Sequence, residues 1–224
     1  MLSKKRKLED SSKDITSAIL IMTDMYQENK GIEEVAFFVN DEIKMKKPKD
    51  SNVNDEIKKL INFGCINDDI NFKPTNIPCI GLVEITNPDI NIVNIVDSIM
   101  ERVINKKAIF EKVLRIIPIQ KIVKVSKEDI CNAIKEIFVS EKEKESVYTY
   151  KVDIRVRRAT INKESLLDSI IDVIDIKHKV NLKKPEVVFL VEIINELAFI
   201  SVITDNKWNK YKRYNVRELT RPNN

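Results

Sequence analysis

Apolar and polar side chains alternate strictly along one segment in the second half of the chain. From residue 148 to residue 156 the even positions hold tyrosine, valine or isoleucine, and the odd positions of the same segment hold Thr149, Lys151, Asp153, Arg155 and Arg157. Successive side chains of a strand point to opposite faces, so one face can be buried while the other meets solvent or a ligand. We therefore predict a strand over 147–157 whose second face is basic and suited to a negatively charged partner.

Strand-like and helical patterns also alternate through the first half of the chain. The apolar run 18–22 predicts a strand, and residues 27–45 repeat apolar side chains at helical spacing. Residues 80–85 predict another strand, and 89–105 again follow a helical stripe. Strand, helix, strand, helix predicts a small α/β sandwich, with ferredoxin-like topology as the leading choice.

A second α/β unit is predicted to follow the first. Its central element is the alternating strand, and capping residues and apolar runs mark the other elements. These are two short extended pieces in 113–125 on either side of Pro118, helices that begin after Ser126 and after Asn162, and a hairpin formed by 187–194 and 197–203 around Asn195-Glu196.

Charge is distributed unevenly between the two halves of this chain of 224 residues. Residues 1–105 hold 14 Lys/Arg against 18 Asp/Glu, whereas residues 106–224 hold 25 against 17, for a net charge of +4. A basic excess concentrated on one part of a protein attracts polyanions and is expected of a nucleic-acid-binding surface. We therefore expect the basic partner-binding surface in the second half.

The segment 206–224 combines basic and aromatic side chains. It carries six Lys/Arg and one acidic residue, interleaved with Trp208, Tyr211 and Tyr214. Aromatic rings among basic side chains can stack on the bases of single-stranded nucleic acid. The same rings can instead pack this segment against the domain, and the sequence favours neither interpretation.

Several classes of function are disfavoured by composition. The only glycines are Gly31, Gly64 and Gly81, so the chain has no glycine-rich loop of the kind that cradles nucleotide or coenzyme phosphates. Three separated cysteines suit neither a disulfide framework nor a zinc site, and the single histidine, His178, is expected at the surface. We expect no catalytic residues, no metal site and no cofactor.

Localisation is predicted from what the sequence contains near its start and along its length. No apolar run approaches the length that a membrane-spanning helix needs, and the N-terminus lacks the apolar core of a signal peptide. We expect an intracellular protein, in the nucleus, the cytoplasm or both. The basic run Lys4–Lys7 is either a nuclear localisation signal or a solubilising cluster.

Five short segments, in this order and spacing, resemble the THUMP domain. They are Arg115-Ile116-Ile117-Pro118, Val156-Arg157-Arg158, Val180-Asn181-Leu182-Lys183-Lys184-Pro185, Val191-Glu192-Ile193 and Lys212-Arg213-Tyr214-Asn215-Val216-Arg217-Glu218-Leu219. The last segment resembles in particular the Tan-type adapter subunit of tRNA cytidine acetylation. The resemblance covers residues 95–219 well and residues 14–94 more loosely.

The resemblance implies a tRNA-binding adapter without catalytic activity of its own. Proteins of this type grip the acceptor stem and the 3′ end of tRNA. They present it to a separate RNA cytidine acetyltransferase, which forms N4-acetylcytidine in the D arm, typically of serine and leucine tRNAs. The expected RNA contacts, from the resemblance and from the basic pattern, are Arg115, Arg155, Arg157 and Arg158, followed by Lys112, Lys183, Lys184, Lys210, Lys212 and Arg213.

The expected organisation is a ferredoxin-like α/β domain followed by a THUMP domain. The divisions are a disordered basic tail over 1–13, the ferredoxin-like domain over 14–105, the THUMP domain over 106–205 and a basic aromatic tail over 206–224. An alternative is the RNA-binding part of another tRNA-modifying enzyme, such as a methyltransferase, a thiouridine synthase or a deaminase. Such enzymes need well over a hundred further residues for catalysis, which is why the adapter is the leading expectation.

Overall fold

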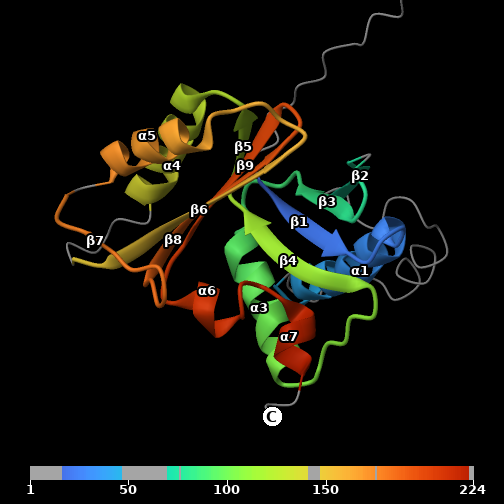
Figure 1. The fold of residues 1–224 in the computed structure, drawn as a ribbon. Helices are drawn as coiled ribbons and strands as arrows, with labels where there is room; N and C mark the ends of the chain where they lie inside the picture. Colours follow the sequence, from blue (N-terminus) through green and yellow to red (C-terminus); the bar gives the residue numbers. More distant parts are fainter. Residues whose placement is uncertain (1–16, 47–69, 76, 141–146, 175, 222–224) are drawn as a thin grey trace, which may run out of the picture.

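The computed structural model describes residues 17–46, 70–75, 77–140, 147–174 and 176–221 (Figure 1). The predicted tail 1–13, including Lys4–Lys7, lies outside these residues, as do Cys65 and Gly64. The described chain forms two sheets with helices against each of them. None of the helices in the described segments is long and apolar enough to cross a membrane.

The first sheet has the topology that the sequence predicted. Its strand order is β2-β3-β1-β4, and every neighbouring pair is antiparallel. One helix connects β1 to β2 and the other connects β3 to β4, which is the split βαβ arrangement of a ferredoxin-like fold. The elements are β1 (Ser17–Thr23), α1 (Glu28–Lys46), β2 (Ile70–Pro74), β3 (Ile80–Ile85), α3 (Ile92–Ile104) and β4 (Val113–Ile119).

Two glycines allow α1 to lie close to this sheet. A Cβ atom on Gly31 would collide with the side chain of Thr23 on β1. A Cβ atom on Gly81 would lie 2.5 Å from Cγ1 of Ile32, which α1 inserts against β3. Since interiors are packed at near-crystalline density, a larger side chain at either position would push the helix away from the sheet.

The second sheet is built around the predicted alternating strand. Its order is β5-β9-β8-β6-β7; β6 is parallel to β7 and β8, and the remaining pairs are antiparallel. The predicted hairpin is confirmed, with Asn195 at φ 54° in its turn. The elements are β5 (Lys121–Lys124), α4 (Lys127–Ser140), β6 (Thr149–Arg157), α5 (Lys163–Val173), β7 (Lys179–Val180), β8 (Val187–Ile194) and β9 (Leu197–Ile203).

The predicted boundary at residue 105 does not coincide with the boundary between the sheets. The two extended pieces expected in 113–125 are present, but the chain breaks at Gln120, and the first piece, β4, belongs to the first sheet. Pro118 lies inside β4 without ending it. Because β4 is an edge strand, a proline there can direct its missing N–H donor away from the ladder.

The two sheets share one core. The inner face of the second sheet contributes Val188, Leu190 and Phe199 to the same apolar cluster as Ile117 of β4. Between the sheets, the side-chain oxygen of Gln120 accepts the N–H of Val202 at 2.7 Å and the hydroxyl of Ser201 at 3.1 Å. The other face of the second sheet forms a separate cluster with α4 and α5.

The C-terminal segment packs against the first unit. It contains α6 (Lys207–Lys210) and α7 (Val216–Thr220), which lie beside α3 in Figure 1. Trp208, Tyr211 and Tyr214 are 2%, 2% and 0% exposed, and the two phenols donate hydrogen bonds to Glu101 and Asp97 on α3. The packing interpretation of these rings is therefore confirmed, and they are not available to stack on RNA bases.

Candidate nucleic-acid interface

The alternating strand β6 has the two faces that its sequence predicted. Tyr150 and Ile154 are buried in the cluster that contains α4 and α5. On the opposite face, Arg155 lies across from Glu192 of β8, and Arg157 lies across from Ile194. This second face looks toward the first sheet rather than into open solvent, since Leu190 and Phe199 of the same face belong to the shared core.

We call the region between the two sheets the crease. It is bounded by Arg155 and Arg157 on β6, Glu192 on β8, Met22 on β1 and Arg115 on β4. Met22 and Arg115 lie opposite one another in the first sheet, and Arg157 reaches across to Met22, with 3.8 Å between its Nη2 and the sulfur.

Arg155 is held by contacts within the protein. Its Nη1 donates to Oε1 of Glu192 at 2.9 Å, and its Nε lies 3.4 Å from Oδ1 of Asp153. The guanidinium also lies over the ring of Trp208, 5.9 Å from the centroid. These contacts give Arg155 a structural role that sequence alone did not distinguish from RNA binding.

Glu192 is a fully buried carboxylate, at 0% exposure. Its Oε2 has no hydrogen-bond partner among the described residues. Burial raises the pKa of Glu192, whereas the nearby Arg155, Arg157 and Arg115 oppose that rise. Two carboxylates, Glu192 and Asp153, thus stand among three guanidinium groups, and the crease keeps a positive excess.

Arg115 and Arg157 supply that excess. Neither guanidinium forms an ion pair with any residue that the structure describes. Burial lowers the pKa of Arg115, and the neighbouring cations Arg155 and Arg213 act in the same direction. A partly desolvated cation beside other cations is destabilising unless an anion compensates it.

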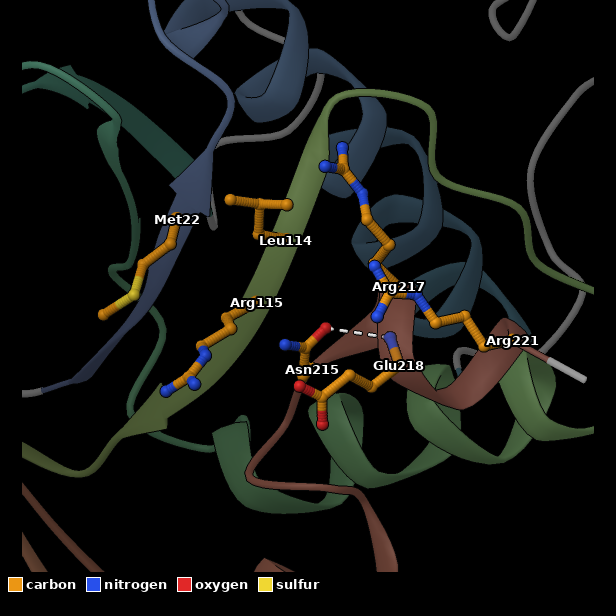
Figure 2. Close-up of a pocket in the computed structure, with 7 residues that line it drawn as sticks. All are labelled: Met22, Leu114, Arg115, Asn215, Arg217, Glu218 and Arg221. Atoms are coloured by element: carbon orange, nitrogen blue, oxygen red, sulfur yellow. Dashed lines mark hydrogen bonds between the residues drawn. The ribbon is translucent and has the colours of Figure 1, made fainter. Parts of the chain in front are cut away.

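The crease continues into a pocket of about 310 Å³ between β1, β4 and α7 (Figure 2). Arg217 on α7 is fixed there by a two-pronged ion pair with Asp24, at 3.0 and 2.6 Å. Arg221 has no ion pair with the described residues. The lining residues are Met22, Leu114, Arg115, Asn215, Arg217, Glu218 and Arg221.

Sequence analysis counted Arg217 and Arg221 among the basic residues of the tail but did not select them as contacts. The sequence near these two arginines does carry a signal of local structure. Asn215 is an N-cap residue whose Oδ1 accepts the N–H of Glu218 at 2.9 Å, as drawn in Figure 2. Such a cap predicts a helix start, and it places Arg217 in the first turn and Arg221 directly after this short helix.

Four other predicted contacts make no ion pair with described residues, and three of them are exposed. Arg158 directly follows β6 at φ 52°. Lys212 and Arg213 lie in the left-handed turn between α6 and α7, and Arg213 is near enough to Arg115 to affect its pKa. Lys112 is half-buried, and its charge helps to lower the pKa of Asp24.

The remaining predicted contacts lie away from the crease or are occupied. Asn181, beside Lys183 and Lys184, donates its N–H to the carbonyl of Tyr150 at the start of β6. Arg157 is seven residues further along, roughly 23 Å away at the rise of a strand. Lys210 pairs with Glu101 and lies over the ring of Tyr211. The structure therefore does not gather all ten predicted residues into one surface.

The expected surface position of His178 is wrong. The imidazole is buried and stacks on Tyr148, with ring centroids 3.5 Å apart, and its Nδ1 accepts the N–H of that tyrosine. Across the part of the chain that the structure describes, no three His, Cys, Asp or Glu side chains are placed to hold a metal ion.

A comparison with protein families identifies the second unit. Residues 124–203 match the family model of the THUMP domain. The chain contains a THUMP domain. Its match begins at the end of β5 and includes Arg155 and Arg157, whereas Arg115 and the pocket belong to the ferredoxin-like unit and α7.

Solved structures provide further likenesses across most of the chain. PH1313 from Pyrococcus horikoshii Ot3 is 14% identical over 84% of this chain and 55% of its own, with a TM-score of 0.49. TrmN from Thermus thermophilus is 14% identical over 83% and 45%, with a TM-score of 0.42. A 4-thiouridine synthetase in complex with RNA and bound ATP is 11% identical over 84% and 42%, with a TM-score of 0.45. This chain spans about half the length of these proteins. No curated protein sequence matches it.

Proposed function

We propose that this chain is a noncatalytic tRNA-binding adapter. It presents tRNA, in particular serine and leucine tRNAs, to a separate RNA cytidine acetyltransferase that forms N4-acetylcytidine in the D arm. The observation that carries the RNA-binding part is a THUMP domain whose basic strand face opens onto Arg115 and Arg157 of the crease, which form no ion pair with described residues.

Phosphate binding is the chemistry that these arginines suit. A guanidinium presents a planar fork of N–H donors that matches phosphate oxygens, and Arg115, Arg157 and Arg221 have no carboxylate partner among the described residues. RNA is recognised largely through its backbone and shape, and this requires positively charged side chains rather than a catalytic constellation. An RNA phosphate in the crease would also relieve the repulsion among its cations.

The acetyltransferase as partner is supported by the resemblance of Lys212–Leu219 to the Tan-type adapters. Within this segment, Tyr214 is fully buried, Asn215 caps α7 and Arg217 pairs with Asp24. These residues hold α7 against the ferredoxin-like unit and thereby form one wall of the pocket. Reconstitution with an RNA cytidine acetyltransferase tests this partner directly.

The RNA contacts are tested first by reversing two charges. The Arg157→Glu, Arg158→Glu variant should keep its fold and lose about tenfold or more in tRNA affinity, and the salt slope of binding should fall by about 2. The matched control, Lys135→Glu with Lys163→Glu, makes the same charge change on the helices α4 and α5. Filter binding measures the tRNA affinity of both variants. Equal losses of affinity in the two variants would refute the site assignment.

The adapter role is tested by reconstitution. Purified protein with tRNA and acetyl-coenzyme A should form no N4-acetylcytidine until an RNA cytidine acetyltransferase is added. Acetylation by this chain alone would contradict the proposal. Modification of the bound tRNA by a methyltransferase, thiouridine synthase or deaminase that co-purifies with the protein would favour the alternative assignment. Sequencing of the co-purified RNA would identify the tRNA species.

A further inference from the structure

We propose that the pocket between β1, β4 and α7 binds the terminal 5′-phosphate of the RNA. This rests on the proposed tRNA-binding function and adds a specific chemical group to it, a phosphate monoester rather than an internal diester. The site lies outside the residues that match the THUMP domain, because all seven lining residues come from the ferredoxin-like unit and α7.

The polar groups of the pocket suit a phosphate. Arg115 projects from β4 and Arg221 follows α7, and neither has an ion pair with described residues (Figure 2). Asn215 uses its Oδ1 to cap α7, which leaves its Nδ2 without a hydrogen bond to any described residue. Arg217 is held in place by Asp24 and forms part of the wall. Arg115, Asn215 and Arg221 therefore supply guanidinium and amide N–H groups to the lining of one hollow.

The charge of the pocket favours a dianion. Its lining has three arginines and one carboxylate, Glu218. Asp24 forms an ion pair with one of these arginines, Arg217, and Arg157 adds a further cation next to Met22. Together these groups leave an excess of two positive charges. A terminal phosphate carries about −1.5 to −2 charges at neutral pH, whereas an internal diester carries one.

The size of the pocket favours a chain end. About 310 Å³ lies at the lower limit of ligand pockets, which is room for one phosphate with its sugar and not for a duplex. An internal phosphate carries a nucleotide on each side, and both would have to lie against the rim of this hollow. A terminal phosphate needs one opening, and Arg157 at Met22 lies where the adjoining backbone would continue into the crease.

The test compares two RNAs that differ only in their 5′ end. A 3′-labelled acceptor-stem RNA is titrated by fluorescence anisotropy with its 5′-phosphate present or removed by phosphatase. Wild-type protein should bind the phosphorylated RNA about tenfold more tightly, the change expected from losing one charge-assisted hydrogen bond. The Arg115→Met, Arg221→Met variant should bind both RNAs equally, since it keeps an unbranched aliphatic stem and removes the two free cations.

A matched control separates this effect from general loss of charge. Lys183→Met with Lys184→Met removes the same charge at the other end of β6. It should leave the preference for the 5′-phosphate intact, whatever its effect on total affinity. Circular dichroism and thermal melting establish that each variant is folded. Neither guanidinium forms a hydrogen bond to described residues, and the backbone pairing of Arg115 in β4 does not depend on its side chain, so the fold should persist.

The possible outcomes separate this inference from the proposed function. Equal binding of the two RNAs by wild-type protein would overturn the terminal-phosphate site while leaving RNA binding in place. A nucleoside 5′-monophosphate that binds as tightly as the phosphorylated RNA would overturn it in favour of a free nucleotide. If no RNA is bound at all, the proposed function fails, and calorimetry with the nucleoside monophosphate then tests the pocket by itself. Binding heat that the Arg115→Met, Arg221→Met variant abolishes would support a phosphate site in the pocket. The absence of binding heat would refute a phosphate site.

Discussion

The two faces of the THUMP sheet differ sharply in what they bury. The face under α4 and α5 is apolar throughout β8 and β9, and Phe189, Val191 and Ile200 on it are fully buried. The face toward the first unit buries Glu192 and Ser201 among its apolar residues and carries Arg155 and Arg157 at its β6 margin. Two packed helices exclude water along a whole face, whereas the crease leaves a margin at which charges can pair or reach an RNA.

Within the crease, two arginines on the same strand face have different roles. Arg155 is bound by Glu192 and Asp153, whereas the guanidinium of Arg157 forms no ion pair with described residues and lies 3.8 Å from the sulfur of Met22. The comparison indicates that position on the basic face does not itself identify an RNA contact. A guanidinium without a carboxylate partner is the better candidate for the proposed RNA contact.

The largest predicted effect concerns the helix-covered face. Phe189→Ala should lower the free energy of unfolding by about 3–5 kcal/mol, because it opens a cavity in a fully buried cluster. The control is Phe37→Ala on α1, where the ring is 63% exposed and the change should stay within about 0.5 kcal/mol. Chemical denaturation measures both, and similar losses would contradict the assigned burial.

The second prediction compares the two arginines of the crease. Arg155→Ala should cost about 3 kcal/mol in stability, because it leaves the buried Glu192 carboxylate without its partner. Arg157→Ala should change stability by less than about 0.5 kcal/mol and weaken tRNA binding. Denaturation and filter binding on the same two proteins provide the check. A stability loss confined to Arg157→Ala would reverse the assignment.

The smallest predicted effect is a pH dependence from Glu192. Its pKa is raised by burial above the ordinary value of 4.5, so the folded protein holds this proton more tightly than the unfolded chain. Stability from this group is then present below pH 4.5 and is lost as pH rises through the folded pKa. Glutamine does not titrate, so the stability of the Glu192→Gln variant relative to wild type should increase as the pH rises from 4.5 through the folded pKa of Glu192. Parallel stability curves for the two proteins would exclude the shift.

Much of the fold followed from short-range patterns. The strand at 80–85, the hairpin strands 187–194 and 197–203 and the two faces of β6 were predicted from apolar periodicity and are confirmed. The ferredoxin-like topology followed from element order. The sheet to which residues 113–119 belong did not follow from short-range patterns. Strand character near Pro118 carries no information about which distant strand this segment pairs with.

The candidate site was predicted less completely for the same reason. Arg115 and Arg157 were selected, but so were Arg155 and Lys210, which the protein's own carboxylates occupy. Arg221 was not selected, although it lines the pocket. Sequence reveals that a side chain is charged, and a distant partner such as Glu101 or Glu192 decides whether that charge is free.

The sequence by itself determined most of the longer strands and helices, the basic face of β6 and the resemblance to a THUMP domain, because each depends on residues close together in the chain. Only the tertiary structure decided that Trp208, Tyr211 and Tyr214 are core and that Arg115, Arg157 and Arg221 gather at the crease and its pocket. Burial and charge pairing depend on residues brought together from β1, β4, β6 and α7, and no local pattern encodes that meeting.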